Sequence, residues 1–262
     1  MLKKILVTGG AGYIGSNLVE FLSERGCHLT IIDKKLGKEV LHFEKTWRFD
    51  AIVHLAAIAG VIECRDDPEE AIRTNVVSSI HIMQLACKYE VPLVFASSGA
   101  APTPYESLYG MTKWIGEVEA HRLNVHGGKN HILRFSNVYG GKYWADKPSV
   151  IPLFLNAKKR GEKLIVNGDG SQTRDFIHVN DVCAAIWLAL NSERITNTPV
   201  PIASGIQTSI LEIAKIIGGP NGYEFNPTSN SVGVSEAISD ITWAEDIYGF
   251  KAVEKIEEHL NN

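Results

Sequence analysis

Short apolar runs alternate with helical patterns along the first half of this chain. KILVTG, HLTIID, AIVHLAA and PLVFASS are continuous and rich in β-branched residues, and amphipathic segments such as NLVEFLSERG separate them. A strand that is buried on both faces has a continuous apolar run, and parallel strands need a crossover connection that is usually a helix. The pattern therefore predicts an α/β fold with a doubly wound parallel sheet.

A glycine-rich turn joins the first predicted strand to the first predicted helix. Thr8 to Gly15 reads TGGAGYIG, which satisfies GxGxxG through Gly10, Gly12 and Gly15. Glycine lets a pyrophosphate approach the backbone N–H groups closely, and the helix N-terminus adds donors and partial positive charge. The string alone is a weak signal, because an ordinary tight strand-to-helix turn is the alternative.

Asp33 closes the second predicted strand, HLTIID, and strengthens the nucleotide interpretation. A carboxylate there can accept hydrogen bonds from the adenosine ribose hydroxyls and repels a 2′-phosphate, which favours NAD over NADP. Lys34 and Lys35 follow directly and weaken that preference. The alternative role for these lysines is a solvated surface pair.

Tyr109 and Lys113 lie at i and i+4 of the helical stretch SLYGMTKWIGE, so both side chains project from one face. An ammonium beside a phenol favours the phenolate, and we expect it to lower the pKa of Tyr109 from about 10 toward the working range of a general base. Ser98 ends the PLVFASS run, at the edge of the sheet that faces a cofactor. A YxxxK pair alone is most often helix surface, but beside the glycine turn and Asp33 it indicates a catalytic site.

Two longer helices are predicted, one over 69–89 and one from about Ser107 to His126. HILRFSNVYG is predicted as a further strand, HVNDVCAAIWLALNS as a helix and VPIAS as a returning strand. Periodicity becomes intermittent in the second half of the chain. The predicted organisation is a Rossmann domain over 1–141, to which 173–205 returns, and a small mixed substrate-binding lobe over 142–172 and 206–262.

Composition and charge exclude several classes of function. The 262 residues carry a formal charge of −4 at pH 7, which gives no support for nucleic acid as a partner. No run of about 18 apolar residues occurs, so we expect no membrane-spanning helix. The four cysteines are widely separated, with no CxxC pair and no Cys/His cluster of metal-ligand spacing. We therefore expect no metal site and interpret the cysteines as reduced thiols of a cytoplasmic protein.

The chain resembles the extended short-chain dehydrogenase/reductases, and among them the NAD-dependent sugar-nucleotide epimerase/dehydratase family. The resemblance covers nearly the whole sequence. Its matching pieces are TGGAGYIG, Asp33, HLAA at 54–57, Asn75, Ser97-Ser98, the Tyr109/Lys113 pair, RFSNVYG at 134–140 and GDGSQTRDFIHVNDV at 168–182.

The resemblance implies roles for individual residues. It implies Tyr109 as the catalytic base, with Ser98 as its partner and Lys113 beside it. The residues implied to hold NAD are Gly9, Gly12, Tyr13, Ile14, Gly15, Asp33, Lys34, Leu55, Ala56, Ala57, Asn75, Ser97, Tyr109, Lys113 and Ser136. Those implied to meet a nucleotide-diphosphate sugar are Ser98, Asn137, Val150 and Arg174. An ion pair with Asp175 or Asp181 is the alternative for Arg174, and His54 and His178 are interpreted as structural.

A homodimer is also implied, because the helices at 69–89 and 107–126 resemble the pair that family members use as an interface. An apolar stripe of Ile72, Val76, Ile80, Met83 and Cys87 fits this interface, although burial in the core explains the stripe equally well.

The residues after Ser98 bear on the type of reaction. Family members that resemble dehydratases or decarboxylases place an acidic residue there, whereas here Gly99, Ala100 and Ala101 follow and the next carboxylate is Glu106. The resemblance therefore implies a NAD-dependent nucleotide-sugar 4-epimerase, of UDP-hexose type, that acts through a transient 4-keto sugar. The alternatives are a NAD(P)H-dependent nucleotide-sugar reductase and a non-catalytic module that binds NAD or a nucleotide.

Three segments depart from the family pattern. Residues 34–53 are too few for the usual helix, strand and helix, and they lack the Gly-Asp segment that touches adenine. The substrate loop before Tyr109 is reduced to APTPYES. SNSVGVSEAISD at 229–240 stands where the family has an arginine for a second phosphate contact. We therefore expect a more exposed adenine and a more open substrate pocket.

Overall fold

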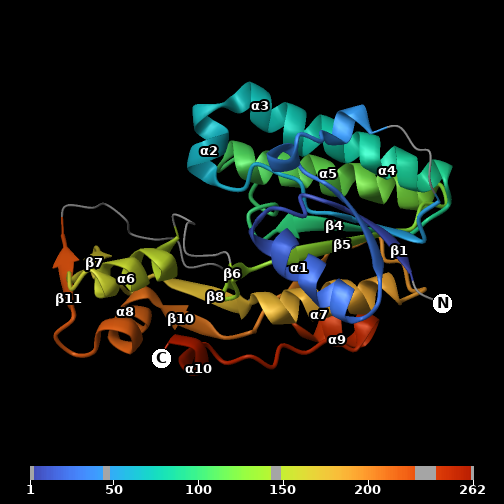
Figure 1. Ribbon diagram of the computed structural model, residues 1–262. Coiled ribbons are helices and arrows are strands. Elements are labelled where there is room, and N and C mark those ends of the chain that lie inside the picture. The colour runs from blue at the N-terminus through green and yellow to red at the C-terminus, as the bar shows by residue number, and fades with distance from the viewer. Residues whose placement is uncertain (1–2, 44–47, 143–148, 228–239, 261–262) are drawn as a thin grey trace. The chain divides into compact units, whose positions relative to one another are not determined.

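The computed structural model describes residues 3–43, 48–142, 149–227 and 240–260. The chain forms two compact units and passes between them several times (Figure 1). The first unit contains Met1–Phe135, Cys183–Ile202 and Thr242–Phe250. The second unit contains Ser136–Val182, Ala203–Ile241 and Lys251–Asn262.

The first unit is built on a six-stranded sheet in which every pair of neighbouring strands is parallel. The strand order is β2-β1-β3-β4-β5-β9, so the chain starts at the second strand, adds β2 at the adjacent edge and then extends the sheet in the other direction as far as β9. The strands are Lys4–Thr8 (β1), His28–Ile32 (β2), Ala51–His54 (β3), Leu93–Ser98 (β4), Asn130–Phe135 (β5) and Val200–Ile202 (β9).

Helices cover both faces of this sheet, with α4 and α5 on one face and α1 on the other (Figure 1). The α-helices of this unit are Tyr13–Glu24 (α1), Val61–Asp66 (α2), Pro68–Ile72 (α3), Ser78–Lys88 (α4), Leu108–Val125 (α5), Thr242–Tyr248 (α9) and the larger part of Val179–Leu190 (α7). Lys34–Leu36 and Val40–His42 form short 3₁₀ turns, and Arg73–Val77 forms a π-helical turn. The predicted doubly wound α/β fold is confirmed.

The core of the first unit explains why the strands read as continuous apolar runs. Leu6, Ile52 and Phe95 come from three neighbouring strands, and they pack in one cluster with Ile82 and Met83 of α4. All five side chains are almost fully buried. Because the strands are parallel, their carboxyl ends meet at one edge, which places the segments that follow β1, β2, β3 and β4 together.

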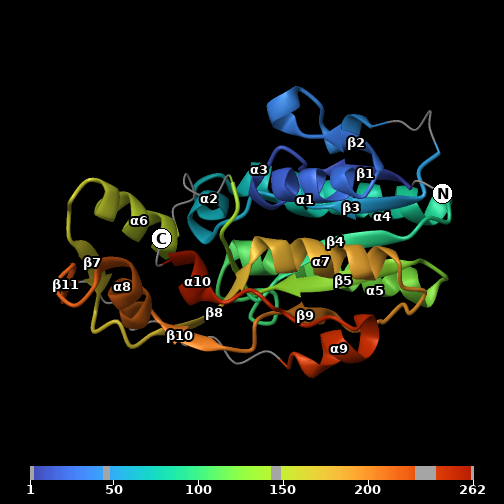
Figure 2. The same ribbon diagram turned by 60° about the horizontal axis from the view of Figure 1, so that its bottom comes forward.

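The second unit is smaller and mixed. One sheet has the order β10-β8-β6, and β7 and β11 form a separate parallel pair beside α8 (Figure 2). Its elements are Asn137–Tyr139 (β6), Val150–Lys159 (α6), Leu164–Asn167 (β7), Thr173–His178 (β8), Gln207–Ser209 (β10), Ile210–Gly218 (α8), Tyr223–Asn226 (β11) and Ile256–Leu260 (α10). Phe154, Leu164 and Ile213 lie in its core.

The boundaries of the two units differ from the predicted boundaries, and the pairing of the strands explains the difference. HILRFSNVYG forms two strands, because Phe135 ends β5 in the large sheet and Asn137 begins β6, which pairs with Phe176 of β8. Residues 136–141 and 173–182 therefore belong to the second unit, and 242–250 belongs to the first. The assignment of the second unit to substrate binding stays a prediction.

The helix predicted over 69–89 is a more broken segment in the structure. It begins earlier, at Val61, and consists of α2, α3, the π turn and α4. Pro68 starts α3, and Asp67 before it accepts a hydrogen bond from the backbone N–H of Glu70 as a helix cap. The second prediction agrees closely, because Ser107 caps α5 and His126 follows its last residue. Among the described residues, no helix has the length and apolar character needed to span a membrane.

Candidate active site

The glycine turn between β1 and α1 has the close packing that requires glycine. Gly9 has a φ of +73°, a left-handed conformation that favours glycine, and a Cβ atom there would lie 2.6 Å from the backbone N of Ala56. A Cβ atom on Gly15 would overlap the carbonyl oxygen of Gly9. Gly12 is the N-cap of α1, so the predicted residues Tyr13, Ile14 and Gly15 form the first helical turn. The helix N-terminus formed by that turn suits a pyrophosphate.

A cavity of about 290 Å³ lies next to this turn. The structure brings together seven of the predicted cofactor residues in its lining, which are Gly9, Gly12, Asp33, Lys34, Leu55, Ala56 and Ala57. Sequence reasoning missed other lining residues, namely Ile32, Lys35, Lys38, Glu39, Val40, Leu41, Ile58, Glu70, Arg73, Thr74 and Ser78. The sequence did contain one signal. Val40 and Leu41 are adjacent apolar residues in the shortened 34–53 segment, which indicates that this segment packs against the protein and can form part of the cavity wall.

Asp33 is buried, and backbone N–H groups hold its carboxylate in place. Its Oδ2 accepts a hydrogen bond from the N–H of Ala11 at 3.0 Å, and its Oδ1 accepts one from the N–H of Lys35 at 2.9 Å. Each carboxylate oxygen can accept two hydrogen bonds, so capacity remains for ribose hydroxyls. The geometry therefore fits the role that the sequence assigns to Asp33.

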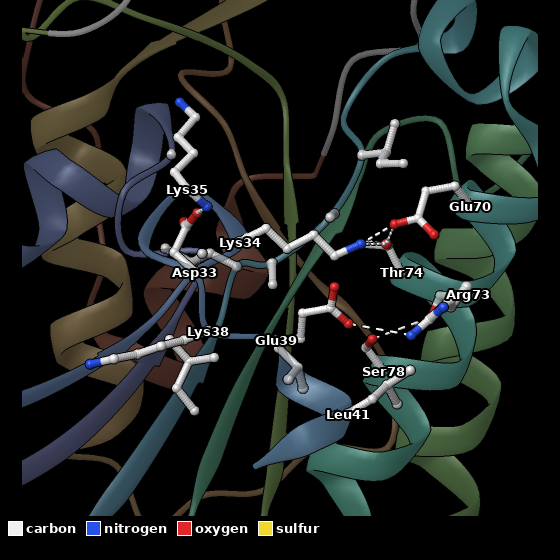
Figure 3. A pocket seen from close by; sticks show the side chains of 18 residues that line it. Asp33, Lys34, Lys35, Lys38, Glu39, Leu41, Glu70, Arg73, Thr74 and Ser78 are labelled. Atoms are coloured by element: carbon white, nitrogen blue, oxygen red, sulfur yellow. Dashed lines mark hydrogen bonds and ion pairs between the residues drawn. The ribbon is translucent and has the colours of Figure 1, made fainter.

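Lys34 extends across the cavity and is not a freely solvated side chain. Its ammonium forms an ion pair with Glu70 and donates a hydrogen bond to Thr74 Oγ1 at 3.1 Å (Figure 3). Lys35 lies differently, with its Nζ 3.4 Å from the carbonyl oxygen of Ala11.

The three predicted catalytic side chains lie together at the carboxyl end of β4 and the start of α5. Tyr109 is hydrogen-bonded to Ser98. The ammonium of Lys113 donates to the carbonyl oxygen of Ala96 at 2.8 Å and lies 6.0 Å from the centre of the Tyr109 ring. Ser107 caps the first turn of α5 by accepting a hydrogen bond from the N–H of Gly110 at 3.0 Å, which fixes where the helix begins.

The electrostatics of this group differ from the sequence expectation. Burial raises the pKa of Tyr109, although its hydrogen bond with Ser98 acts in the opposite direction. Burial also lowers the pKa of Lys113 to about 8. The expectation of a lowered pKa for Tyr109 was therefore wrong, because the loss of solvation outweighs the hydrogen bond with Ser98. Burial thus favours the neutral form of both side chains.

Two predicted cofactor residues, Asn75 and Ser97, have side chains that bond to other parts of the protein. Asn75 accepts a hydrogen bond from the N–H of Ile58 at 2.8 Å and donates to Thr112 Oγ1 at 3.1 Å. Asn75 thereby links the segment after β3 to Thr112, which lies between Tyr109 and Lys113 on α5. Ser97 donates its hydroxyl hydrogen to Glu117, so this hydroxyl is committed to α5.

His54 has the structural role that the sequence reading gave it. Its Nδ1 lies 2.6 Å from Thr8 Oγ1 and its Nε2 lies 2.9 Å from Ser79 Oγ, so both ring nitrogens are engaged inside the first unit. Burial lowers the pKa of His54 to about 3, and burial lowers the pKa of His131, in the same unit, to about 4.

We expect the free energy of unfolding to fall as the pH drops from about 6.5 to about 4. Over this window His54 and His131 bind protons in the unfolded chain but stay neutral in the folded protein, because their folded pKa values lie below the ordinary 6.5. Each contributes a loss of about 1.4 kcal/mol per pH unit. Chemical denaturation at pH 7, 6 and 5 measures the slope. Equal free energies of unfolding at pH 7 and pH 5 would contradict this expectation.

In the second unit, Asn137, Val150 and Arg174 line one cavity of about 670 Å³. Three of the four predicted substrate residues are thus brought together, and Ser98 belongs to the first unit. Sequence reasoning missed Arg160, Glu162 and Lys163, which line the same cavity, and Arg160 forms an ion pair with Glu162 at 2.7 Å. The counterpart of the second phosphate contact, at 229–239, lies outside the described residues.

Asp175 organises the base of β8 and explains the position of Ser136. The buried carboxylate accepts hydrogen bonds from Ser136 Oγ at 2.9 Å, from the N–H of Ser204 at 2.9 Å and from the N–H of Gly205 at 2.7 Å. Asp181 accepts from the backbone N–H groups of residues 253 and 254. Ser136, predicted to contact the cofactor, therefore makes a bond within the second unit.

The second unit also brings together His178, Glu254 and His259, a group that the sequence reading did not foresee. Glu254 Oε2 lies 2.8 Å from Nε2 of His259, and the two imidazole rings stack with their centres 4.0 Å apart and an interplanar angle of 16°. Because ring lone pairs lie in the ring planes, nearly parallel stacked rings do not direct them at one point. His178 also accepts a hydrogen bond from the N–H of Asn180 at the start of α7, at 3.3 Å, which fits a structural role.

Comparison with known proteins identifies several relatives along most of the chain. A Bacillus cytotoxicus UDP-N-acetyl-alpha-D-glucosaminuronate decarboxylase is 33% identical over 258 residues, covering 83% of this chain and 80% of that protein. A Methanocaldococcus jannaschii protein, assigned provisionally as a UDP-glucose 4-epimerase, is 32% identical over 258 residues, covering 84% and 83%. The crystal structure of a Thermotoga maritima UDP-glucose 4-epimerase with UDP-glucose superposes with a TM-score of 0.84 at 28% identity, covering 98% and 96%.

A family model described as "NAD dependent epimerase/dehydratase family" matches residues 5–202. The match spans the glycine turn, the Tyr109/Lys113 pair and the strand that carries Arg174. The resemblance inferred from the sequence motifs is confirmed. This chain belongs to the NAD dependent epimerase/dehydratase family.

Proposed function

We propose that the protein is a NAD-dependent 4-epimerase of UDP-hexoses. The observation that carries the proposal is the group of Tyr109, Ser98 and Lys113 at the end of β4, followed by three small residues where an elimination or a related step needs an additional acid or base. Glu106 is the first carboxylate after Ser98, and its Oε2 accepts a hydrogen bond from Thr103 at 3.0 Å. This arrangement provides one proton-transfer group, which is what inversion at a single carbinol carbon requires.

The cavity beside the glycine turn fits NAD. The packing at Gly9 and Gly15 leaves no room for a side chain at either position, which favours the approach of a pyrophosphate to the N–H groups at the start of α1. In this proposal Asp33 holds the adenosine ribose, and Leu55, Ala56 and Ala57 line the cofactor site. Bound NAD supplies the redox chemistry, first as acceptor and then as donor of the hydride at C4 of the sugar.

Tyr109, Ser98 and Lys113 handle the proton in this proposal. Tyr109 acts in its phenolate form, which burial disfavours: the phenolate oxygen takes up the proton of the C4 hydroxyl as the hydride leaves C4 and gives it back after the 4-keto sugar has turned over. Ser98, hydrogen-bonded to Tyr109, orients the same oxygen of the sugar. The ammonium of Lys113 stabilises the phenolate while it exists, and its anchoring to the carbonyl of Ala96 fixes where that charge lies.

The cavity of the second unit supports a nucleotide-diphosphate sugar as the substrate. The guanidinium of Arg174 lines it together with Asn137 and the first residue of α6, Val150. The T. maritima structure contains UDP-glucose and the B. cytotoxicus relative is named for a UDP-sugar, so we propose a UDP-sugar for this chain.

Replacing Arg174 with alanine is expected to weaken UDP-glucose binding about thirtyfold and to leave NAD affinity unchanged, because a charge-assisted contact to the diphosphate is lost. Isothermal titration calorimetry with each ligand measures both constants. Arg122→Ala is the control, since Arg122 is an exposed arginine paired with Glu119. An unaltered dissociation constant for UDP-glucose in the Arg174 variant would remove Arg174 from the phosphate site.

Decarboxylation of a UDP-hexuronic acid is the second candidate, because the 33% identical B. cytotoxicus relative carries a decarboxylase name. Like the epimerase proposal, it begins with oxidation at C4. The two activities differ in their product, which keeps all six sugar carbons in an epimerase and loses one as carbon dioxide in a decarboxylase.

Incubation of the purified protein with NAD and a panel of UDP-hexoses and UDP-hexuronic acids, followed by NMR of the products, tests the proposal. Inversion at C4 with no net change in absorbance at 340 nm supports an epimerase. Release of carbon dioxide supports the decarboxylase, and stoichiometric consumption of NAD(P)H supports a reductase. Tight NAD binding with no turnover of any sugar would support a binding module and contradict the proposal.

We also propose a homodimer that uses α4 and α5, which lie side by side (Figure 1). Trp114 and Val118 of α5 are exposed apolar side chains, as are Ile72 and Val77 just before α4. Within the predicted stripe, Met83 is buried and serves the core, so the stripe is divided between core and surface. The oligomeric state in solution and a cytoplasmic location both stay proposals.

A further inference from the structure

An ion pair crosses the cavity of the first unit immediately beside Asp33. Lys34 starts a short 3₁₀ turn after β2, whereas Glu70 and Thr74 belong to α3 and the π turn on the opposite wall. The Lys34 ammonium forms an ion pair with Glu70 and donates to Thr74 Oγ1 (Figure 3). Thr74 in turn donates to Glu70 Oε1 at 3.1 Å, so the carboxylate is held on two sides.

A second pair neutralises the other cation on this wall. Arg73 lies 3.3 Å from Glu39 Oε2, and Figure 3 shows both pairs on the same side of the cavity. The ammonium groups of Lys35 and Lys38 point toward the opposite side. Lys34 and Arg73 are each paired with a carboxylate on this wall, whereas Lys35 and Lys38 add positive charge and Asp33 adds negative charge to the rest of the lining.

We propose that Glu70 determines which dinucleotide this protein binds. By holding the Lys34 ammonium against Thr74, Glu70 withholds the cation next to Asp33 from a phosphate on the 2′ position of the adenosine ribose, so the cavity accepts NAD and rejects NADP. The inference rests on the proposed function, because it requires a dinucleotide in this cavity with its ribose at Asp33. The inference gives a role in cofactor specificity to Glu70, which lies on α3, whereas Asp33 lies at the end of β2.

The physical argument concerns a competition for one ammonium group. A 2′-phosphate is a dianion that needs a cation to offset the repulsion from Asp33. Lys34 directly follows Asp33 in the sequence, and its flexible four-carbon stem lets the ammonium turn toward either partner. The hydrogen bond from Lys34 keeps the pKa of Glu70 low, so the competing carboxylate stays ionised at neutral pH. Glutamine at this position keeps the shape of the side chain and removes the competing charge.

The test compares the dissociation constants of NAD⁺ and NADP⁺ for four proteins by isothermal titration calorimetry at one fixed salt concentration. The proteins are the natural chain, Glu70→Gln, the double variant Lys34→Gln/Glu70→Gln, and Glu69→Gln. Glu69 is the matched control because it is the neighbouring glutamate of α3 and is exposed to solvent. Circular dichroism and a melting temperature confirm that each variant is folded.

Glu70→Gln is expected to tighten NADP⁺ binding about tenfold while NAD⁺ binding changes less than about twofold. The double variant is expected to lose this gain, because the freed ammonium is absent, and Glu69→Gln is expected to match the natural chain. Unchanged NADP⁺ affinity in Glu70→Gln, or a gain that persists in the double variant, overturns the inference and leaves the proposed function intact. If the natural chain binds neither dinucleotide, the inference and the proposed cofactor fall together.

Discussion

Replacing Tyr109 with phenylalanine is expected to lower kcat by about three orders of magnitude and to leave NAD affinity nearly unchanged. Phenylalanine keeps the ring that packs near Lys113 but lacks the oxygen that is hydrogen-bonded to Ser98. The loss is confined to proton transfer, so kcat falls while binding constants stay close to their original values. Steady-state kinetics on the active UDP-sugar, together with calorimetric titration of NAD, measure both effects.

Tyr105→Phe is the matched control for this variant. Tyr105 lies in the loop just before α5, four residues ahead of Tyr109, and is 86% exposed, so losing its hydroxyl should leave kcat within about twofold. Retention of most of the activity by Tyr109→Phe would remove Tyr109 as the base. An equal loss in both variants would point to the loop as a whole instead of one oxygen.

Glu117→Gln is expected to destabilise the protein by about 3 kcal/mol, the largest effect of a single substitution on folding that we predict. Glu117 is 5% exposed and lies one turn after Lys113 on α5. It accepts two hydrogen bonds from Arg134 of β5, at 2.7 and 2.6 Å, and one from Ser97 of β4. Removing the carboxylate charge leaves the guanidinium without its counter-ion in a largely desolvated place. The value is at the lower end for a buried pair because Arg134 keeps some exposure.

Urea denaturation of the natural chain and the variant measures this change in the free energy of unfolding. Asp66→Asn provides the comparison, because the pair that Asp66 forms with Arg65 is exposed on the surface, and such pairs contribute about 0.5 kcal/mol or less. A Glu117 variant as stable as the Asp66 variant would show that the network joining α5, β4 and β5 contributes nothing to folding.

The parts of the fold that sequence predicted best are those set by local chemistry. The end of β1, the glycine turn and the start of α1 follow from backbone conformations and close contacts that glycine alone allows. The limits of α5 follow from the Ser107 cap and the Gly127-Gly128 pair after the helix. Asp33 lies close to the segment after β3 because both follow parallel strands, whose carboxyl ends meet at one edge of the sheet.

Features that depend on distant pairing were predicted less well. Nothing in HILRFSNVYG indicates a break at Ser136, because the break arises from pairing of β6 with β8 some 40 residues later. The sequence also did not predict that Glu70 and Arg73 line the cavity of the first unit. Their positions depend on how the segment that contains α3 lies against the shortened segment after β2. The pKa of Tyr109 was misjudged because the cost of burial cannot be judged from an i, i+4 spacing.

The most direct test of the account follows deuterium at C4 of UDP-glucose. Conversion of the labelled sugar in the presence of NAD, with NMR and mass spectrometry of the product, shows whether C4 is inverted and whether the label stays. The account predicts UDP-galactose that keeps its deuterium at C4, with no net formation of NADH. Loss of the deuterium to solvent, or recovery of UDP-glucose without inversion at C4, would contradict the account.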